Sequence, residues 1–467
     1  MDQSQIEQRL ARRVRRFLSG RRIGTDDITG NLRVWTWNGD SQQLEPQEVD
    51  PEVGTRQRGV RLAKSLYNIN PGNAENQKLL MLSELETRKR AKGPSRPIDT
   101  EAFLKSYPGQ SAVRINELLP QAIELDLIPA AIACCEVLKQ TGDASLLHGR
   151  PPALVQAILT GERQLQFAAF DAIAQIDPQS PFGGCSYVSD FATFIASSRF
   201  QRAALVGHNR EDIARATASA LIPLRWQGDP AVATREIFER VDANPDLEIL
   251  LIGDSLTQPA VRELVQQLRV NWKTKSLPIG ILASSEAQLI RSSQLTAGAE
   301  RLLTFPYSSE SEALVRQMGE LEKLQNTWAA VSSDDRYAHA SRAIDWLSRV
   351  ASESKYDFYN AAHYESRMLD WLYHPEFTEP AAKILSANPS PAAQQALVSF
   401  ISQNELPIEA RQAVAEAFEK AVKTSGTLLT TSEINLQYDR YNASENQPKE
   451  TQQVLGRVLD IIEAAKQ

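Results

Sequence analysis

The chain has 467 residues, a length that allows about three domains and a sizeable core. Hydrophobic residues make up 42% and charged residues 23%, which argues against a disordered chain, and 22 Gly and 24 Pro exclude collagen-like and low-complexity classes. The net charge of -7 argues against a protein that coats nucleic acid, and no apolar run reaches the roughly 18 residues that span a bilayer. Three Cys and five His leave little material for metal or acid–base chemistry, so we expect no metal, no cofactor and no catalytic residue. Cys134 and Cys135 are expected to be core thiols.

Residues 1–50 are predicted to form a basic helix and a short cap. Residues 1–22 hold seven Arg beside an apolar helical face. Such a helix can bind an anionic surface or serve as a transit peptide, and it can equally be the solvated first helix of a fold. Residues 31–37 alternate like a short strand and lead into a turn at 38–40. Since no secretory signal is visible, we expect a cytoplasmic protein; the sequence leaves open a leader removed before residue 1.

Helical periodicity dominates residues 51–200 and 326–467, which we assign as two helical regions. In GERQLQFAAFDAIAQIDP (161–178) and LPIEARQAVAEAFEKAV (406–422), Ala mixes with larger apolar residues, as in helices that approach closely. Both runs resemble helices of HEAT or armadillo repeats, which stack into a solenoid. A non-repeating helical bundle is the alternative. The basic run RKRAKGPSRP is predicted to be an exposed loop or linker, with a nucleic-acid-binding patch as the alternative, and residues 425–450 are predicted to be a connector.

Aromatic side chains gather between residues 326 and 377. We expect most of them to be core or inter-helix contacts, and a groove for a partner is the alternative. They are Trp328, Trp346, Trp371, Tyr356, Tyr359, Tyr364 and Tyr373.

Residues 201–325 alternate short apolar runs with amphipathic helices. Strands that are apolar throughout and separated by helices predict a parallel sheet covered on both faces. Five such units fit a flavodoxin-like, doubly wound, five-stranded parallel sheet. The fold class is therefore mainly α with one α/β domain, flanked by HEAT-like helical regions. The strand-like runs are AALVGHN (203–209), IPLRWQG (222–228), LEILLIGDS (247–255), LPIGILASS (277–285) and ERLLTFPYS (300–308).

The end of this block resembles a response-regulator receiver domain. LPIGILAS is similar to the family's fourth strand, and TAGAERLLTFPYSSESEALVRQM is similar to its fifth strand, following turn and last helix. The resemblance implies a phospho-accepting Asp at the end of the third strand, where Gly253 and Asp254 stand. It also implies metal-binding acids after the first strand, a hydroxyl after the fourth and a Lys after the fifth.

The sequence departs from the receiver pattern at most of these positions. Residues 207–209 are Gly, His and Asn, where the acidic pair belongs. Ala283 stands where the hydroxyl belongs, with Ser284 next to it, and Phe305 replaces the Lys before Pro306. Without the metal ligands and the cation, we interpret the domain as a pseudo-receiver that does not accept phosphate. Asp254 is then expected to be a loop carboxylate or a helix N-cap.

The string GDSLT (253–257) is similar to the nucleophile block of GDSL-type esterases, in which Ser255 would attack an ester. That family's late Asp-x-x-His is missing, because 335–339 and 370–374 each hold one residue too many. The competing interpretation is that Gly253 turns the strand end while Asp254 or Ser255 caps the next helix.

The hypothesis that follows is a non-catalytic scaffold that binds proteins and carries a phosphorylation-incompetent pseudo-receiver. This arrangement resembles bacterial proteins that combine degenerate HEAT repeats with a receiver-like module. The alternatives are a signalling receiver phosphorylated at Asp254 and an esterase that uses Ser255. We expect protein partners, no nucleic acid and no transmembrane segment, and the α/β domain could also form a homodimer. The domains are assigned as 1–50, 51–200, 201–325 and 326–467.

Overall fold

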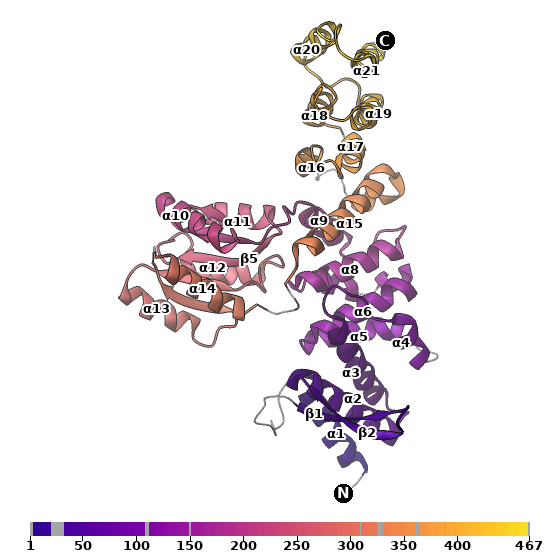
Figure 1. The fold of residues 1–467 in the computed structure, drawn as a ribbon, viewed down its shortest axis with the longest axis vertical. Coiled ribbons are helices and arrows are strands. Elements are labelled where there is room, and N and C mark those ends of the chain that lie inside the picture. The colour runs from indigo at the N-terminus through magenta and orange to yellow at the C-terminus, as the bar shows by residue number, and fades with distance from the viewer. Residues whose placement is uncertain are drawn as a thin grey trace. The chain divides into compact units, whose positions relative to one another are not determined.

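The computed structural model describes residues 3–19, 32–107, 112–148, 151–308, 310–325, 328, 330–359, 365–387 and 389–465 (Figure 1). The chain divides into two compact units. Unit 1 comprises Met1–Pro178, Ala204–Ile237 and Glu248–Val331, and unit 2 comprises Gln179–Ala203, Phe238–Leu247 and Ser332–Gln467. A mainly helical chain with one five-stranded α/β domain is thereby confirmed. Within the described residues, every helix is too short or too polar to cross a bilayer.

Unit 1 begins with a helix and a hairpin that both pack on a longer helix. The elements are α1 (Gln3–Leu18), β1 (Leu32–Asn38), β2 (Gln43–Val49), α2 (Pro51–Ile69) and α3 (Ala74–Lys92). The sequence predicts β1 but not β2, whose polar residues and Pro46 argue against a strand. Because β2 is paired only with β1 and lies at an open edge, both its polarity and its proline are tolerated.

The free edge of β1 is closed by side chains from α2. The guanidinium of Arg61 donates to the carbonyl of Trp35 at 2.6 Å, and that of Arg58 donates to the carbonyl of Arg33 at 3.4 Å. The outer face of the hairpin stays open, with Trp35 and Trp37 respectively 52% and 64% exposed.

The next helices in the chain form a cluster around α6, whose residues from Ile128 to Val137 are almost all buried. They are α4 (Thr100–Ser106), α5 (Ala112–Glu124), α6 (Ile128–Thr141), a short 3-10 helix (Ala144–His148), α7 (Ala153–Ile158) and α8 (Arg163–Ile176). Cys134 and Cys135 are free and buried in α6, which confirms them as core thiols.

The basic run 88–97 is helical over its first half, because α3 continues to Lys92. Lys89 is 1% exposed and pairs with Glu136, so the prediction of an exposed loop is wrong there. The burial of Lys89 could not be predicted from the local sequence, because its partner Glu136 lies 47 residues later in the chain.

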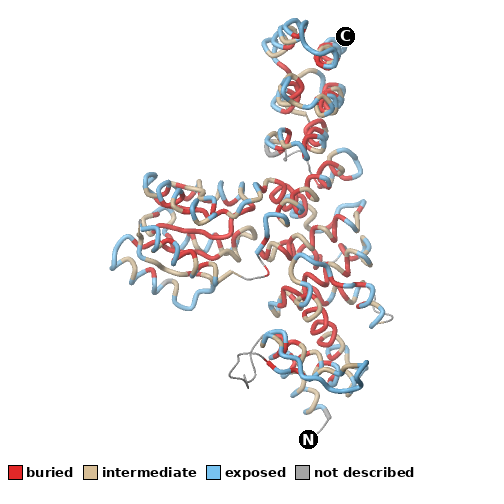
Figure 2. Tube along the Cα trace, viewed as in Figure 1, coloured by how far each residue is buried: buried red, intermediate tan, exposed pale blue. Residues whose placement is uncertain are grey.

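The α/β domain is a sheet with strand order β4-β3-β5-β6-β7, in which β5, β6 and β7 pair in parallel. Figure 2 shows its strands buried and the outer faces of its helices exposed. Its strands are β3 (Ala203–Gly207), β4 (Gln227–Ala231), β5 (Leu247–Gly253), β6 (Ile279–Ala283) and β7 (Leu302–Pro306). Its helices are α10 (Glu211–Leu221), a 3-10 turn (Ile222–Leu224), α11 (Thr234–Ala243), α12 (Val261–Val270), α13 (Glu286–Thr296) and α14 (Ser311–Lys323).

The second strand lies later in the chain than the sequence predicts. Residues 222–228 were expected to form it, but residues 222–224 close α10, and β4 instead begins at Gln227 and runs through Pro230. Since β4 is the edge strand of the sheet, a proline is allowed there. Trp226, which made the run look strand-like, lies in the core against α10 and α14.

The amino-terminal edge of this sheet is fastened to the turn between α7 and α8. Arg301, just before β7, donates to Glu162 at 2.8 Å, and Ser276, before β6, donates to the carbonyl of Gly161 at 2.5 Å. Lys275 donates to the carbonyl of Leu159. Gly161 has a φ of +86°, and a Cβ there would meet Lys275 Cγ at 2.8 Å. We call this set of contacts the α7–α8 joint. Because these contacts lie at the amino-terminal ends of the strands, they do not cover the carboxyl edge of the sheet.

Unit 2 is helical in its C-terminal part, and Figure 1 shows α16/α17, α18/α19 and α20/α21 as successive pairs. Its helices are α9 (Cys185–Ala196), α15 (Ser333–Ser352), a 3-10 helix (Ser354–Tyr359), α16 (Glu365–Trp371), α17 (Thr378–Ala387), α18 (Pro391–Ile401), α19 (Ile408–Ser425), α20 (Thr431–Asn442) and α21 (Lys449–Ala464). The expected connector at 425–450 thus contains a helix, α20. Its start was visible in the sequence, since Thr430 and Glu433 form a capping box.

A buried ion pair lies inside unit 2. Arg336, in the first turn of α15, donates to Asp246 at 2.8 Å, and the two side chains are 6% and 2% exposed. Asp246 also accepts hydrogen bonds from the hydroxyl of Ser198 and the backbone N–H of Arg199, both at 2.6 Å. The charge of the carboxylate is therefore neutralised, and each of its two oxygens accepts at least one hydrogen bond.

Candidate functional site

The carboxyl edge of the sheet gathers the residues that the sequence singled out. Parallel strands bring their carboxyl ends to one edge, so the ends of β3, β5, β6 and β7 lie next to one another. Gly253 is the last residue of β5, and Asp254 is the first residue beyond it. Asp254 is therefore the carboxylate at the end of the third strand of the domain, where the receiver resemblance implies a phospho-accepting Asp.

Asp254 is a loop carboxylate that ties β5 to β6. Its Oδ2 accepts from the backbone N–H of Ser284 at 2.9 Å and from the Ser284 hydroxyl at 3.0 Å. Its Oδ1 is buried and has no hydrogen-bond partner among the described residues. The expectation that Asp254 or Ser255 caps the next helix is wrong, because α12 starts at Val261 with Ala260 at the cap position. The intervening loop separates them.

His208 is the residue at this edge whose role the sequence did not reveal. It follows β3, is 7% exposed, and packs so closely on β5 that a Cβ at Gly253 would lie 2.5 Å from its ring. Its Nδ1 accepts the backbone N–H of Arg210 at 3.0 Å, and its Nε2 lies 3.3 Å from the hydroxyl of Ser255. Burial lowers the pKa of His208, against a smaller opposing effect of the Asp254 charge.

The hydrogen bonds of His208 decide which nitrogen carries its proton. Because Nδ1 accepts a hydrogen bond, the neutral ring holds its proton on Nε2, the atom that faces Ser255. A general base for Ser255 would need the opposite tautomer, with Nδ1–H held by a carboxylate. The Ser255–His208 contact therefore differs from the arrangement of a serine hydrolase. The chain-order argument pointed to His339 and His374 and missed this neighbour, which lies 47 residues earlier.

The end of β7 offers no charge to the site. Phe305 packs into the core around α14, and its ring would lie 3.3 Å from a Cβ at Gly280. Pro306 is exposed and its carbonyl accepts from Gln317 at 2.9 Å, while Ala283 is buried at the end of β6. Among the described residues, no group of three His, Cys, Asp or Glu side chains is placed to hold a metal ion.

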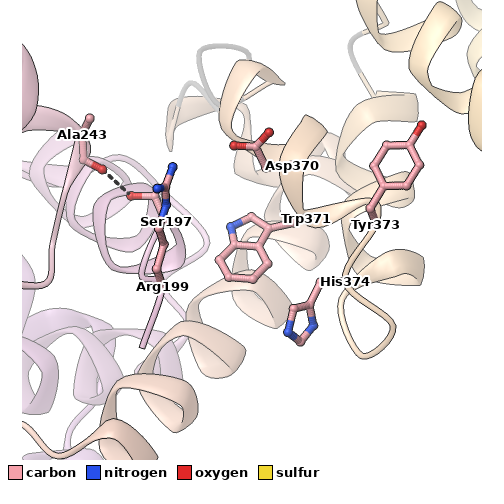
Figure 3. Close-up of a pocket in the computed structure, with 7 residues that line it drawn as sticks. All are labelled: Ser197, Arg199, Ala243, Asp370, Trp371, Tyr373 and His374. Carbon is pink, nitrogen blue, oxygen red and sulfur yellow. Dashed lines mark hydrogen bonds between the residues drawn. The ribbon is translucent and has the colours of Figure 1, made fainter. Parts of the chain in front are cut away.

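A second candidate site is a pocket of unit 2 with a volume of about 390 Å³ (Figure 3). It is lined by Ser197, Arg199, Ala243, Asp370, Trp371, Tyr373 and His374. The volume lies within the range of ordinary small-ligand or side-chain pockets.

The pocket combines flat aromatic surface with opposite charges. In Figure 3, Asp370 lies above Trp371, with Arg199 on one side of these two residues and Tyr373 on the other. Arg199 and Asp370 are exposed, and within the part of the chain that the structure describes neither forms an ion pair. Nδ1 of His374 is buried and has no hydrogen-bond partner there, although its ring stacks on Phe377 with centroids 4.7 Å apart.

The aromatic residues of this region divide between core and surface. Trp346, Tyr356 and Tyr359 are at most 2% exposed, which confirms them as core residues. Tyr373 is 45% exposed, so it stands at the rim of the pocket. Tyr364 lies outside the described residues.

No protein-family model and no curated protein sequence matches this chain.

Proposed function

We propose that this chain is a non-catalytic scaffold for proteins and that its α/β domain is a receiver-like module that does not accept phosphate. Counted within the domain, the strand order is 2-1-3-4-5, the order of flavodoxin-like sheets, which supports that assignment. The Ala-containing helix pairs of both units support the assignment of HEAT-like repeats.

The observation that carries the proposal is the pair of side chains at the ends of β3 and β7. Aspartyl phosphorylation needs a metal held by carboxylates and a cation for the phosphoryl oxygens. At the end of β3, where the metal-binding carboxylates would stand, the imidazole of His208 packs on Gly253. At the end of β7, where the cation would stand, the ring of Phe305 packs into the core. Asp254 meanwhile already bonds Ser284.

Phosphorylation is tested by incubating the chain with Mg²⁺ and acetyl phosphate and measuring its intact mass. We expect no adduct. A labile phosphate adduct that disappears in Asp254→Asn would contradict the proposal and favour a signalling receiver. Hydrolysis of a short-chain activated ester that is lost in Ser255→Ala would contradict it in favour of an esterase.

Binding is tested at the unit 2 pocket, because its exposed Tyr373, Arg199 and Asp370 can contact a partner side chain. Pull-downs from the native host are compared for wild type, Tyr373→Ser and Tyr187→Ser. Tyr187 is the matched control, since it is 42% exposed in the same unit and does not line the pocket. We expect a protein that both wild type and the Tyr187 variant retain and the Tyr373 variant loses. Identical sets for all three would count against this pocket as a docking point.

A further inference from the structure

The first helix turns one face inward and an arginine stripe outward. Val14, Phe17 and Leu18 are at most 5% exposed. A Cβ at Gly59 of α2 would lie 3.1 Å from Phe17, and Arg56 of α2 donates to the carbonyl of Phe17 at 3.1 Å. The apolar face of α1 is thus already used in folding.

The opposite face carries Arg9, Arg12, Arg13 and Arg16, all exposed. Their spacing of i, i+3, i+4 and i+7 places them in one row, about 10 Å long at 1.5 Å per residue. We call this row the α1 arginine stripe. Within the described residues, none of its four guanidiniums forms an ion pair or hydrogen bond. Arg15, which lies off the row, is 3.9 Å from Glu75.

The one acidic side chain described on α1 is turned away from the stripe. Glu7 is partly buried and accepts from Asn70 at 3.2 Å and from Asn73 at 3.4 Å. Like charges three and four residues apart repel one another, so the stripe opposes helix formation instead of supporting it. An external anion would relieve this repulsion.

We propose that the α1 arginine stripe binds the surface of an anionic lipid bilayer. Guanidiniums pair with phosphate in a bidentate way, and a straight row on the outside of a helix can meet many headgroups of a plane at once. The contact is peripheral, because the apolar face that would insert into lipid is buried against α2. No aromatic side chain stands in the row for a nucleic-acid base to stack on. This inference is independent of the proposed scaffold function.

The test is co-sedimentation of the full chain with vesicles. One set is phosphatidylcholine alone, and the other contains about one third phosphatidylglycerol. We expect binding to the anionic vesicles only, weakening as salt is raised. Replacing the four arginines of the stripe by Gln should weaken binding at least about tenfold, and replacing them by Lys should retain most of it.

The matched control replaces Arg225, Arg262, Arg291 and Arg316 by Gln. These four are also exposed and remove the same charge, taking the net charge from -7 to -11 in both variants. Equal loss of binding in both variants would overturn the proposal, since net charge alone would then explain it. Equal binding of wild type to neutral vesicles, or tighter binding to duplex DNA than to anionic vesicles, would overturn it as well.

Discussion

The ring of His208 carries the clearest pH signature of the site. It is buried between the ends of β3 and β5 and faces Asp254, Ser255 and the backbone of Arg210. Burial lowers its pKa from the ordinary 6.5, so the unfolded chain binds a proton that the folded chain rejects. Its contribution to stability is therefore present above pH 6.5 and is lost as the pH falls through the folded-state pKa.

We expect the stability of the His208→Gln variant to depend less on pH than that of the wild type. Wild type should lose more stability than the variant when the pH is lowered from about 7 to about 5.5, because Gln has no proton to bind. Urea unfolding at several pH values measures this difference. Parallel curves for the two proteins would show that His208 does not titrate in this range.

The buried Asp246–Arg336 pair is the residue-scale feature with the largest expected cost. In Arg336→Met, Asp246 keeps the donors of Ser198 and Arg199 but loses its countercharge, and removal of one partner of a buried pair costs about 3–5 kcal/mol. Lys383→Met is the control, since its pair with Glu379 is exposed and worth about 0.5 kcal/mol or less. Chemical denaturation should separate the two variants clearly, and similar costs would contradict the assigned burial.

At the scale of elements, the α7–α8 joint depends on a glycine. Gly161→Ala meets two penalties, a φ of +86° and a clash with Lys275, while Gly298→Ala meets only the first, with a φ of +76° and open space around it. We expect about 1 kcal/mol of destabilisation for Gly298→Ala and at least about 1 kcal/mol more for Gly161→Ala. Hydrogen exchange should rise at the start of α8 in the Gly161 variant alone. Equal hydrogen exchange at the start of α8 in the two variants would contradict a role of Gly161 in the α7–α8 joint.

The α1 arginine stripe has its own energetic consequence in the absence of any ligand. Arg12 has like-charged neighbours at Arg9, three residues before it, and Arg16, four residues after it. Each such pair costs about 0.2–0.5 kcal/mol, so Arg12→Gln should stabilise the chain by about 0.5 kcal/mol at low salt. The gain should shrink at high salt, where the repulsion is screened. Thermal unfolding at two salt concentrations checks it, and a destabilised Arg12 variant would contradict it.

Elements with an apolar period were predictable, and elements held by distant partners were not. The buried strands β3, β5 and β6 and the helices α8, α19 and α21 lie where the periodicity predicts them. The strands β2 and β4 were missed or misplaced because polar residues and prolines are tolerated at a sheet edge. The burial of Lys89 was not predicted because this side chain is neutralised from another helix.

The site was predictable in place but not in contacts. The carboxyl ends of successive parallel strands must meet, so residues 253–255, 283–284 and 305–306 were expected together. The contact between His208 and Ser255 was not predicted, because the expected sheet brings the ends of β3 and β5 together but does not fix the direction of either side chain. Nor could the pocket of unit 2, whose lining comes from three separate parts of the chain.

At the scale of the whole molecule, two compact units predict unfolding in more than one step. Each unit has its own buried apolar side chains, among them Leu66 and Phe170 in unit 1 and Val414 and Phe418 in unit 2. We expect calorimetry to resolve at least two transitions and Arg336→Met to lower only one of them. One transition that shifts as a whole in the variant would show that the units unfold together.

The capping of β1 by Arg58 and Arg61 has a consequence for how copies of this chain behave in concentrated solution. An open strand edge beside two exposed tryptophans would be a template for strand-by-strand association between molecules. Because α2 already occupies the carbonyls of Arg33 and Trp35, a second chain finds fewer free acceptors there. The hairpin can therefore keep its aromatic face in water while the edge formed by β1 is protected from strand pairing with a second chain.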